Sequence, residues 1–129
     1  MALLDEIADR LALLDLGLIV KGQMPATPDR AVALNEYAGG GAETGFGFPG
    51  LQDELPGLQV KVRGVRDDYA GPRDVIETIY RELPKVQGQL LSGTMYRMIK
   101  PQQVPFILER DSSERCVFAV NFLCEKEFQ

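Results

Sequence analysis

One alternating stretch, residues 56–65, constrains the fold more than any other part of this sequence. It reads Pro-Gly-Leu-Gln-Val-Lys-Val-Arg-Gly-Val, so apolar residues at 58, 60 and 62 alternate with polar ones at 59, 61 and 63. This period of two is typical of a strand with one buried face. A Pro-Gly turn opens the stretch and a charged run at 66–68 follows it. We predict a β-strand here, around which the other elements are arranged.

Two amphipathic helices are predicted, one on each side of this strand in the sequence. Residues 3–14 repeat apolar side chains with the i, i+3/i+4, i+7 spacing that gives a helix one apolar face. Residues 72–83 show the same spacing. Pro72 suits the first helical position, Asp74 then falls in the first turn, and Pro84 ends the helix.

Other segments have the composition of strands. Residues 31–37 form an apolar strand, and residues 96–102 and 104–109 form an edge or bent strand because Pro101 and Pro105 cannot donate to a ladder. Residues 87–94 read as a turn region and residues 111–114 as a hairpin turn. The last strand, 115–125, has an apolar face at 116, 118, 120, 122 and 124 and a partly apolar opposite face, so we expect it to be central.

These elements predict a single α+β domain over residues 1–129. Its sheet is expected to be four-stranded and mainly antiparallel, with both helices packed on one face. A chain of 129 residues is long enough to bury a core without metal or disulfide staples. The strand residues that the helices should cover are Val60, Val62, Phe118, Val120 and Phe122.

Residues 38–57 are predicted to form an extended Gly-rich loop, longer than most loops in compact domains. The loop contains the spacing of a dinucleotide-binding fingerprint at Gly45, Gly47 and Gly50. Only five residues separate Gly50 from the next strand's Pro-Gly turn, too few for the helix whose N-terminus holds the pyrophosphate. The loop's apolar side chains are costly to expose, so we interpret them as contacts for a partner or a neighbouring subunit. These side chains are Phe46, Phe48 and Leu51.

The composition argues against catalysis and against nucleic-acid binding. The chain has no histidine and no tryptophan, which excludes histidine-dependent nucleophiles and histidine-based zinc sites. Cys116 and Cys124, eight residues apart on one strand, would lie about 27 Å apart, so they are expected to be buried free thiols. A net charge of −5 disfavours a phosphate clamp. We predict no enzymatic activity, no cofactor, no metal and no membrane span. A basic sheet face from Lys61, Arg63, Arg97 and Lys100 is possible, but solvated charges are the simpler reading.

The order of these segments resembles that of the small minor capsid proteins of tailed bacteriophages that look like tail terminator, or tail completion, proteins. The similarity covers nearly the whole chain and involves no catalytic motif. Its most specific pieces are Ala33-Leu34-Asn35-Glu36-Tyr37 and Pro56-Gly57-Leu58-Gln59-Val60-Lys61-Val62-Arg63, joined by the Gly-rich segment, together with Asp68-Tyr69-Ala70, Ile79-Tyr80, and Pro105-Phe106 ahead of Arg110-Asp111.

The resemblance implies a virion protein of the neck and tail, made in the host bacterial cytoplasm. It implies a homo-oligomeric ring, typically sixfold, that caps the tail tube and joins it to the head connector or head-closure proteins. DNA would pass through the lumen without specific binding, kept from sticking by acidic residues on the lumen. Two alternatives stay open: a head-closing connector of the same neck, and a small-ligand-binding domain or enzyme that uses the Gly-rich loop as a lid.

Overall fold

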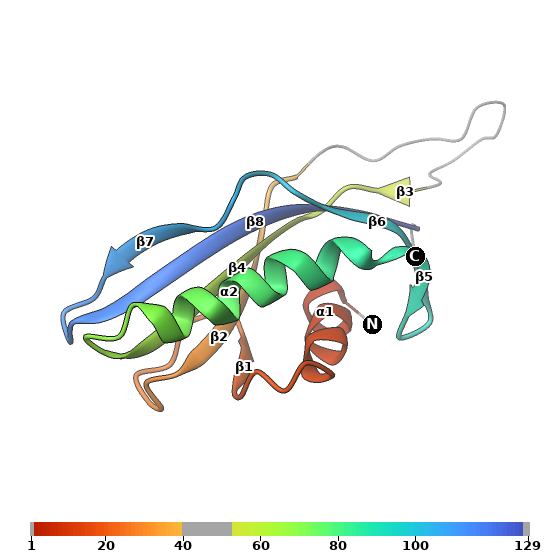
Figure 1. The fold of residues 1–129 in the computed structure, drawn as a ribbon. Coiled ribbons are helices and arrows are strands. Elements are labelled where there is room, and N and C mark those ends of the chain that lie inside the picture. The colour runs from red at the N-terminus through yellow and green to blue at the C-terminus, as the bar shows by residue number, and fades with distance from the viewer. Residues whose placement is uncertain (1, 40–52, 128–129) are drawn as a thin grey trace, which may run out of the picture.

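The longest strand, β8 (Arg115–Glu127), is the centre of the sheet in this computed structural model, which describes residues 2–39 and 53–127 (Figure 1). β4 (Gly57–Arg66) and β3 (Asp53–Glu54) pair with one edge of β8. β7 (Phe106–Arg110) and β6 (Thr94–Pro101) share the other edge. The prediction that the last strand is central is confirmed, as is the bent course of the chain that forms β6 and β7.

The sheet is larger than predicted and it is mixed. Among the described residues it has eight strands, with β1-β2-β4-β8-β6-β5 along its main path. β2 (Ala31–Tyr37) pairs antiparallel with β4, whereas β1 (Ile19–Lys21) pairs parallel with β2. The prediction of a four-stranded, mainly antiparallel sheet is therefore wrong in size and in the β1 pairing. β1 and β3 have three and two residues, too short to show a period of two in the sequence.

The predicted turn region at 87–94 is a hairpin instead. β5 (Gln87–Leu91) pairs antiparallel with β6, and Leu91 lies opposite Thr94. The two residues between them, Ser92 and Gly93, have φ of 50° and 88°, as the tight turn of a two-residue hairpin requires. β5 was missed because its first four residues are all exposed, so no apolar alternation marks the strand.

The two helices begin and end close to the predicted residues. α1 spans Leu3–Ala12, and α2 spans Ala70–Glu82 before one 3-10 turn, Leu83–Lys85. Pro72 is not the first helical residue and no acidic residue lies in the first turn, which corrects the placement of Asp74. The carboxylate of Asp68 accepts a hydrogen bond of 3.1 Å from the N–H of Gly71 instead, ahead of the helix. Pro84 lies inside the 3-10 turn.

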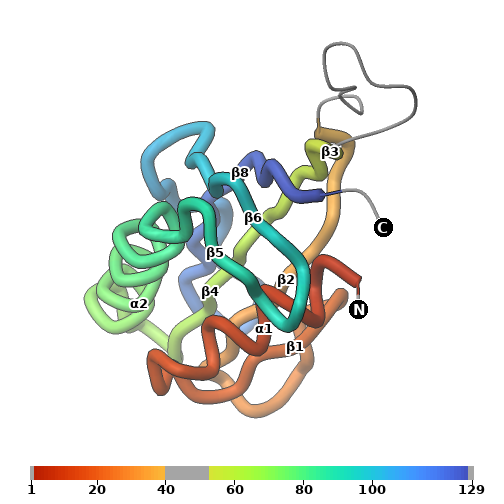
Figure 2. The backbone as a smooth tube through the Cα atoms, turned by 90° about the vertical axis from the view of Figure 1, so that its right-hand side faces the viewer, coloured from red at the N-terminus to blue at the C-terminus, as the bar shows by residue number. Residues whose placement is uncertain are grey.

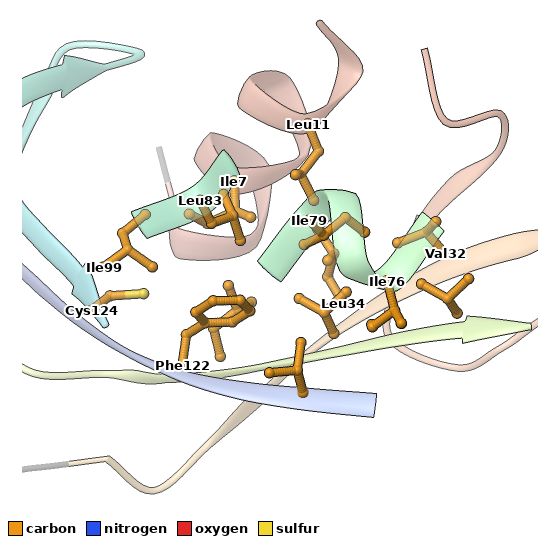
Figure 3. Packing of buried hydrophobic residues seen from close by; sticks show 14 of the residues in the cluster. Ile7, Leu11, Val32, Leu34, Ile76, Ile79, Leu83, Ile99, Phe122 and Cys124 are labelled. Carbon is orange, nitrogen blue, oxygen red and sulfur yellow. The ribbon is translucent and has the colours of Figure 1, made fainter. Parts of the chain in front are cut away.

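Both helices pack their apolar sides into one core, as predicted (Figure 3). Ile7 and Leu11 of α1 belong to the same buried cluster as Ile76 and Ile79 of α2, and in Figure 3 Leu11 points toward Ile79. Phe122 of β8 is also part of this cluster. α1 also contacts the two terminal strands of the sheet path, β1 and β5, and lies near both in Figure 2. The predicted strand residues of the core are all buried: Val60, Val62, Phe118, Val120 and Phe122.

Candidate assembly surfaces

β7 presents apolar side chains to solvent along an unpaired edge. Within the described residues this strand pairs with β8 alone. Ile107 and Leu108 are 52% and 41% exposed, and Val104, just before the strand, is 65% exposed. The preceding segment is held in place because Arg73 of α2 donates a hydrogen bond of 3.2 Å to the carbonyl of Pro105. We call Val104, Ile107 and Leu108 the β7 surface.

A second apolar surface lies where α1 meets β5. Leu13 and Leu90 are 77% and 63% exposed. They line a shallow cavity of about 250 Å³ together with Arg10. Ser92 in the hairpin turn donates a hydrogen bond of 3.0 Å to Asp9, which fixes the hairpin against the helix. We call Leu13, Leu90 and Arg10 the β5 surface. It lies at the other end of the molecule from β7 (Figure 1).

Two arginines hold the β1–β2 connection and the β7–β8 turn in place at one end of the molecule. Arg115 donates hydrogen bonds of 2.8 Å to Asp111 and 3.0 Å to Asp29. Arg63 donates two of 2.8 Å to the carbonyls of Pro28 and Asp29. Burial lowers the pKa of Arg63. Burial also acts to lower the pKa of Arg115, but the hydrogen bonds from Arg115 to Asp29 and Asp111 outweigh it and raise this pKa. The β1–β2 connection is therefore fixed to the sheet.

A buried ionic cluster joins the first helix to the last strand. The Oε1 atom of Glu6 accepts hydrogen bonds of 2.8 Å from the Tyr96 hydroxyl and 2.9 Å from the Lys126 ammonium. Glu6 is 0% exposed and Lys126 is 5% exposed. Burial alone would raise the pKa of Glu6, but hydrogen bonds from Thr94, Lys126 and Tyr96 outweigh it and lower this pKa. Burial, reinforced by Glu6, raises the pKa of Tyr96. Sequence reasoning missed the cluster because Glu6 lies 90 positions from Tyr96 and 120 positions from Lys126.

The other candidate residues do not converge on a chemical site. Phe46, Phe48 and Leu51 lie outside the described residues. Arg63 is buried and bonded to main-chain carbonyls, and Arg97 pairs with Asp53 at 3.4 Å, so the possible basic face is interrupted. Cys116 and Cys124 are free and buried as predicted, and burial raises the pKa of the Cys124 thiol to about 12.

A cavity of about 490 Å³ beside the start of α2 is the place to consider for a small ligand. Its lining is mainly apolar, with Asp15, Arg30 and Arg63 as charged members. The Arg63 guanidinium already donates to two carbonyls. Within residues 2–39 and 53–127 there is no group of three metal-ligating side chains. No helix there is long and apolar enough to cross a membrane.

Comparisons with known proteins point to one kind of particle. A family model described as bacteriophage tail terminator protein matches residues 8–128. Among solved structures, a chain from the virion of a native gene transfer agent particle is similar in fold, with a TM-score of 0.74 at 12% identity. The alignment covers 98% of this chain and 96% of that chain. No curated protein matches the sequence.

Proposed function

Because this chain belongs to the bacteriophage tail terminator protein family and is a structural protein of the virion tail, we propose that its copies form a ring at the head–tail interface. The ring, sixfold in our proposal, caps the tail tube and joins it to the head connector or head-closure proteins. The family match over residues 8–128 carries this proposal. The fold shared with a chain of a gene transfer agent virion supports it.

The distribution of surfaces supports a role in assembly. Exposed apolar patches on a small protein commonly mark sites of protein contact. The described part of this subunit has the β7 and β5 surfaces, which lie on different elements. Two different surfaces on one subunit allow head-to-tail contact, which closes into a ring when the rotation between subunits permits.

We also propose that the protein acts through contacts and not through catalysis. Two neighbouring carboxylates, Asp67 and Asp68, have structural contacts: Asp67 pairs with Arg110, and Asp68 accepts a hydrogen bond ahead of α2. DNA passes through the ring without specific binding in this proposal, in keeping with the net charge of −5. A head-closing connector remains the alternative, and it differs in the partner bound.

Negative-stain imaging of the purified protein, alone and with assembled tail tubes, tests the proposal. We expect rings with a central hole, and one ring at a single end of each tube. Binding to the portal side of the head without binding to tubes would favour the head-closing role. A protein that stays monomeric and binds neither structure would contradict both.

The Gly-rich loop gives a separate prediction about the partner. Phe46, Phe48 and Leu51 are proposed to become buried on assembly, each contributing about 1.5–3 kcal/mol when fully covered. The double substitution Phe46→Ser and Phe48→Ser should weaken ring formation or tube binding while leaving the melting temperature of the monomer unchanged. Calorimetry and imaging measure the two effects. A large drop in the melting temperature would show that these side chains belong to the subunit's own core.

A further inference from the structure

We propose that neighbouring copies of this chain join by strand addition, with β7 of one subunit lying beside β5 of the next. This inference rests on the proposed ring and names the contact that would hold it together. Its basis is a shared property of the two strands. Both are edge strands, and both are exposed on each of their faces.

Such exposure is unusual for strands of a folded sheet. A strand commonly buries at least one face, and an open edge is usually protected by charge, proline or a covering element. β5 has no charged residue or proline, and its first four residues are exposed. β7 follows Pro105 and carries two charged residues, Glu109 and Arg110, at its end, but only Phe106 of the strand is partly buried. The other two edge strands, β1 and β3, differ because Ile19 and Val20 of β1 and both residues of β3 are half-buried. The open main-chain groups of β5 and β7 are therefore the ones available to a second copy.

The side chains around the two edges are complementary. Ile107 and Leu108 provide the apolar contact on β7, and Leu13 and Leu90 provide it beside β5. Pairing the strands would remove these four exposed side chains from water together, which favours association.

Charge favours this pairing over pairing of like strands. Glu109 is exposed on β7 and makes no ion pair within the described residues, and Arg10 beside β5 makes none there either. β7 against β5 brings the Glu109 carboxylate toward the Arg10 guanidinium. In β7 against β7, Glu109 would find no unpaired cation, because Arg110 of β7 is already paired with Asp67 and Glu114. Opposite charges across an interface help to fix the register and the partner.

The position of the two strands gives the contact a direction. β7 and β5 lie at different ends of the molecule (Figure 1). A contact between two different surfaces is heterologous, so a growing chain of subunits keeps a free β7 edge at one end and a free β5 edge at the other until the ring closes. An isologous dimer would use the same strand twice and stop growing.

Thiol cross-linking of full-length variants distinguishes these arrangements. Leu90→Cys and Ile107→Cys are made separately, mixed, and treated with a short bismaleimide. The native thiols are buried, so the unmodified protein serves as the unreactive control. We expect a covalent dimer only in the mixture, and none when Leu90→Cys is mixed with Leu18→Cys. Reaction of either variant with itself as strongly as in the mixture would overturn the inference.

Charge substitutions give a second readout. Glu109→Arg and Arg10→Glu should each raise the concentration needed for half-assembly about tenfold, and the two together should recover it. The matched control is Glu36→Arg, which makes the same charge change at an exposed position of β2. Suppose that rings form, that the mixture gives no cross-linked dimer, and that Glu109→Arg leaves the half-assembly concentration unchanged. This result would overturn the strand contact but not the proposed ring. Absence of both rings and adducts would overturn both.

Discussion

Glu6 and Lys126 are two charged side chains that are buried next to each other. They form an ion pair of 2.9 Å, with side chains 0% and 6% exposed. Removing one partner of a buried pair leaves the other charge without compensation, a cost of about 3–5 kcal/mol. We predict that Lys126→Met lowers the free energy of unfolding by about this amount in urea denaturation. The matched control is Lys85→Met, which breaks an exposed pair with Glu82 and should change it by less than about 1 kcal/mol.

The same cluster predicts a dependence on pH. The folded-state pKa of Glu6 lies below its ordinary value of 4.5, chiefly because hydrogen bonds from Thr94, Lys126 and Tyr96 outweigh the effect of burial. A lowered folded-state pKa contributes stability that is complete above the unfolded-state pKa and is lost as the pH falls through the folded-state value. The free-energy difference between the native protein and Glu6→Gln should therefore be constant above pH 4.5 and shrink below it. A difference that stays constant down to acid unfolding would contradict this account.

Among the elements, the contact between β4 and α2 depends on a single glycine. A Cβ atom at Gly64 would lie 2.7 Å from both Cγ and Cδ of Pro72. Because Pro72 is rigid and buried, the start of α2 would have to move away from the strand. We predict that Gly64→Ala costs about 1–3 kcal/mol of stability and increases amide exchange in the first turns of α2. Ser113→Ala, in the exposed β7–β8 turn, is the control and should change neither quantity.

The sequence predicts best those elements whose own apolar pattern shows which of their faces is buried. β4, β8 and both helices alternate or repeat apolar residues toward the shared core, so their existence and inner faces are readable from the chain. β1 and β3 are too short to show an apolar pattern in the sequence, because they span only Ile19–Lys21 and Asp53–Glu54. They are recognised as strands only from their pairing with neighbouring strands. β5 was not predicted because its first four residues are exposed and show no apolar alternation. The Ser92-Gly93 dipeptide marks a turn in the sequence, but it does not by itself show that strands flank the turn.

The candidate surfaces were less accessible to sequence reasoning. Ile107 and Leu108 are exposed on an edge strand. In the sequence, an apolar residue of an edge strand looks the same as an apolar residue of a strand that is paired on both sides. Leu13 and Leu90 come together only because α1 meets β5. The predicted contacts at Phe46, Phe48 and Leu51 stay a prediction.

For the whole molecule, the sign of the charge predicts its behaviour toward DNA. The chain carries 14 basic and 19 acidic residues. Arg110 and Arg115 are paired with carboxylates, and Arg63 is bound to main-chain carbonyls, which lowers the number of cations free to contact phosphate. We predict no saturable binding of duplex DNA in fluorescence anisotropy at physiological ionic strength, for monomer or ring. Binding that weakens steeply with added salt would contradict this and indicate a basic lumen.

The place of β8 in the sequence has a consequence for the order of events during synthesis. The strand that pairs with β3, β4, β6 and β7 is the last of the eight to leave the ribosome. Until then β4 and β6 have no central neighbour, and the apolar faces of both helices lack Phe118, Val120 and Phe122. The fold is therefore completed after translation of this segment, through contacts between distant parts of the chain, which is slow compared with local folding. Unfinished subunits expose apolar surface in this interval, which makes them prone to aggregate before folding is complete.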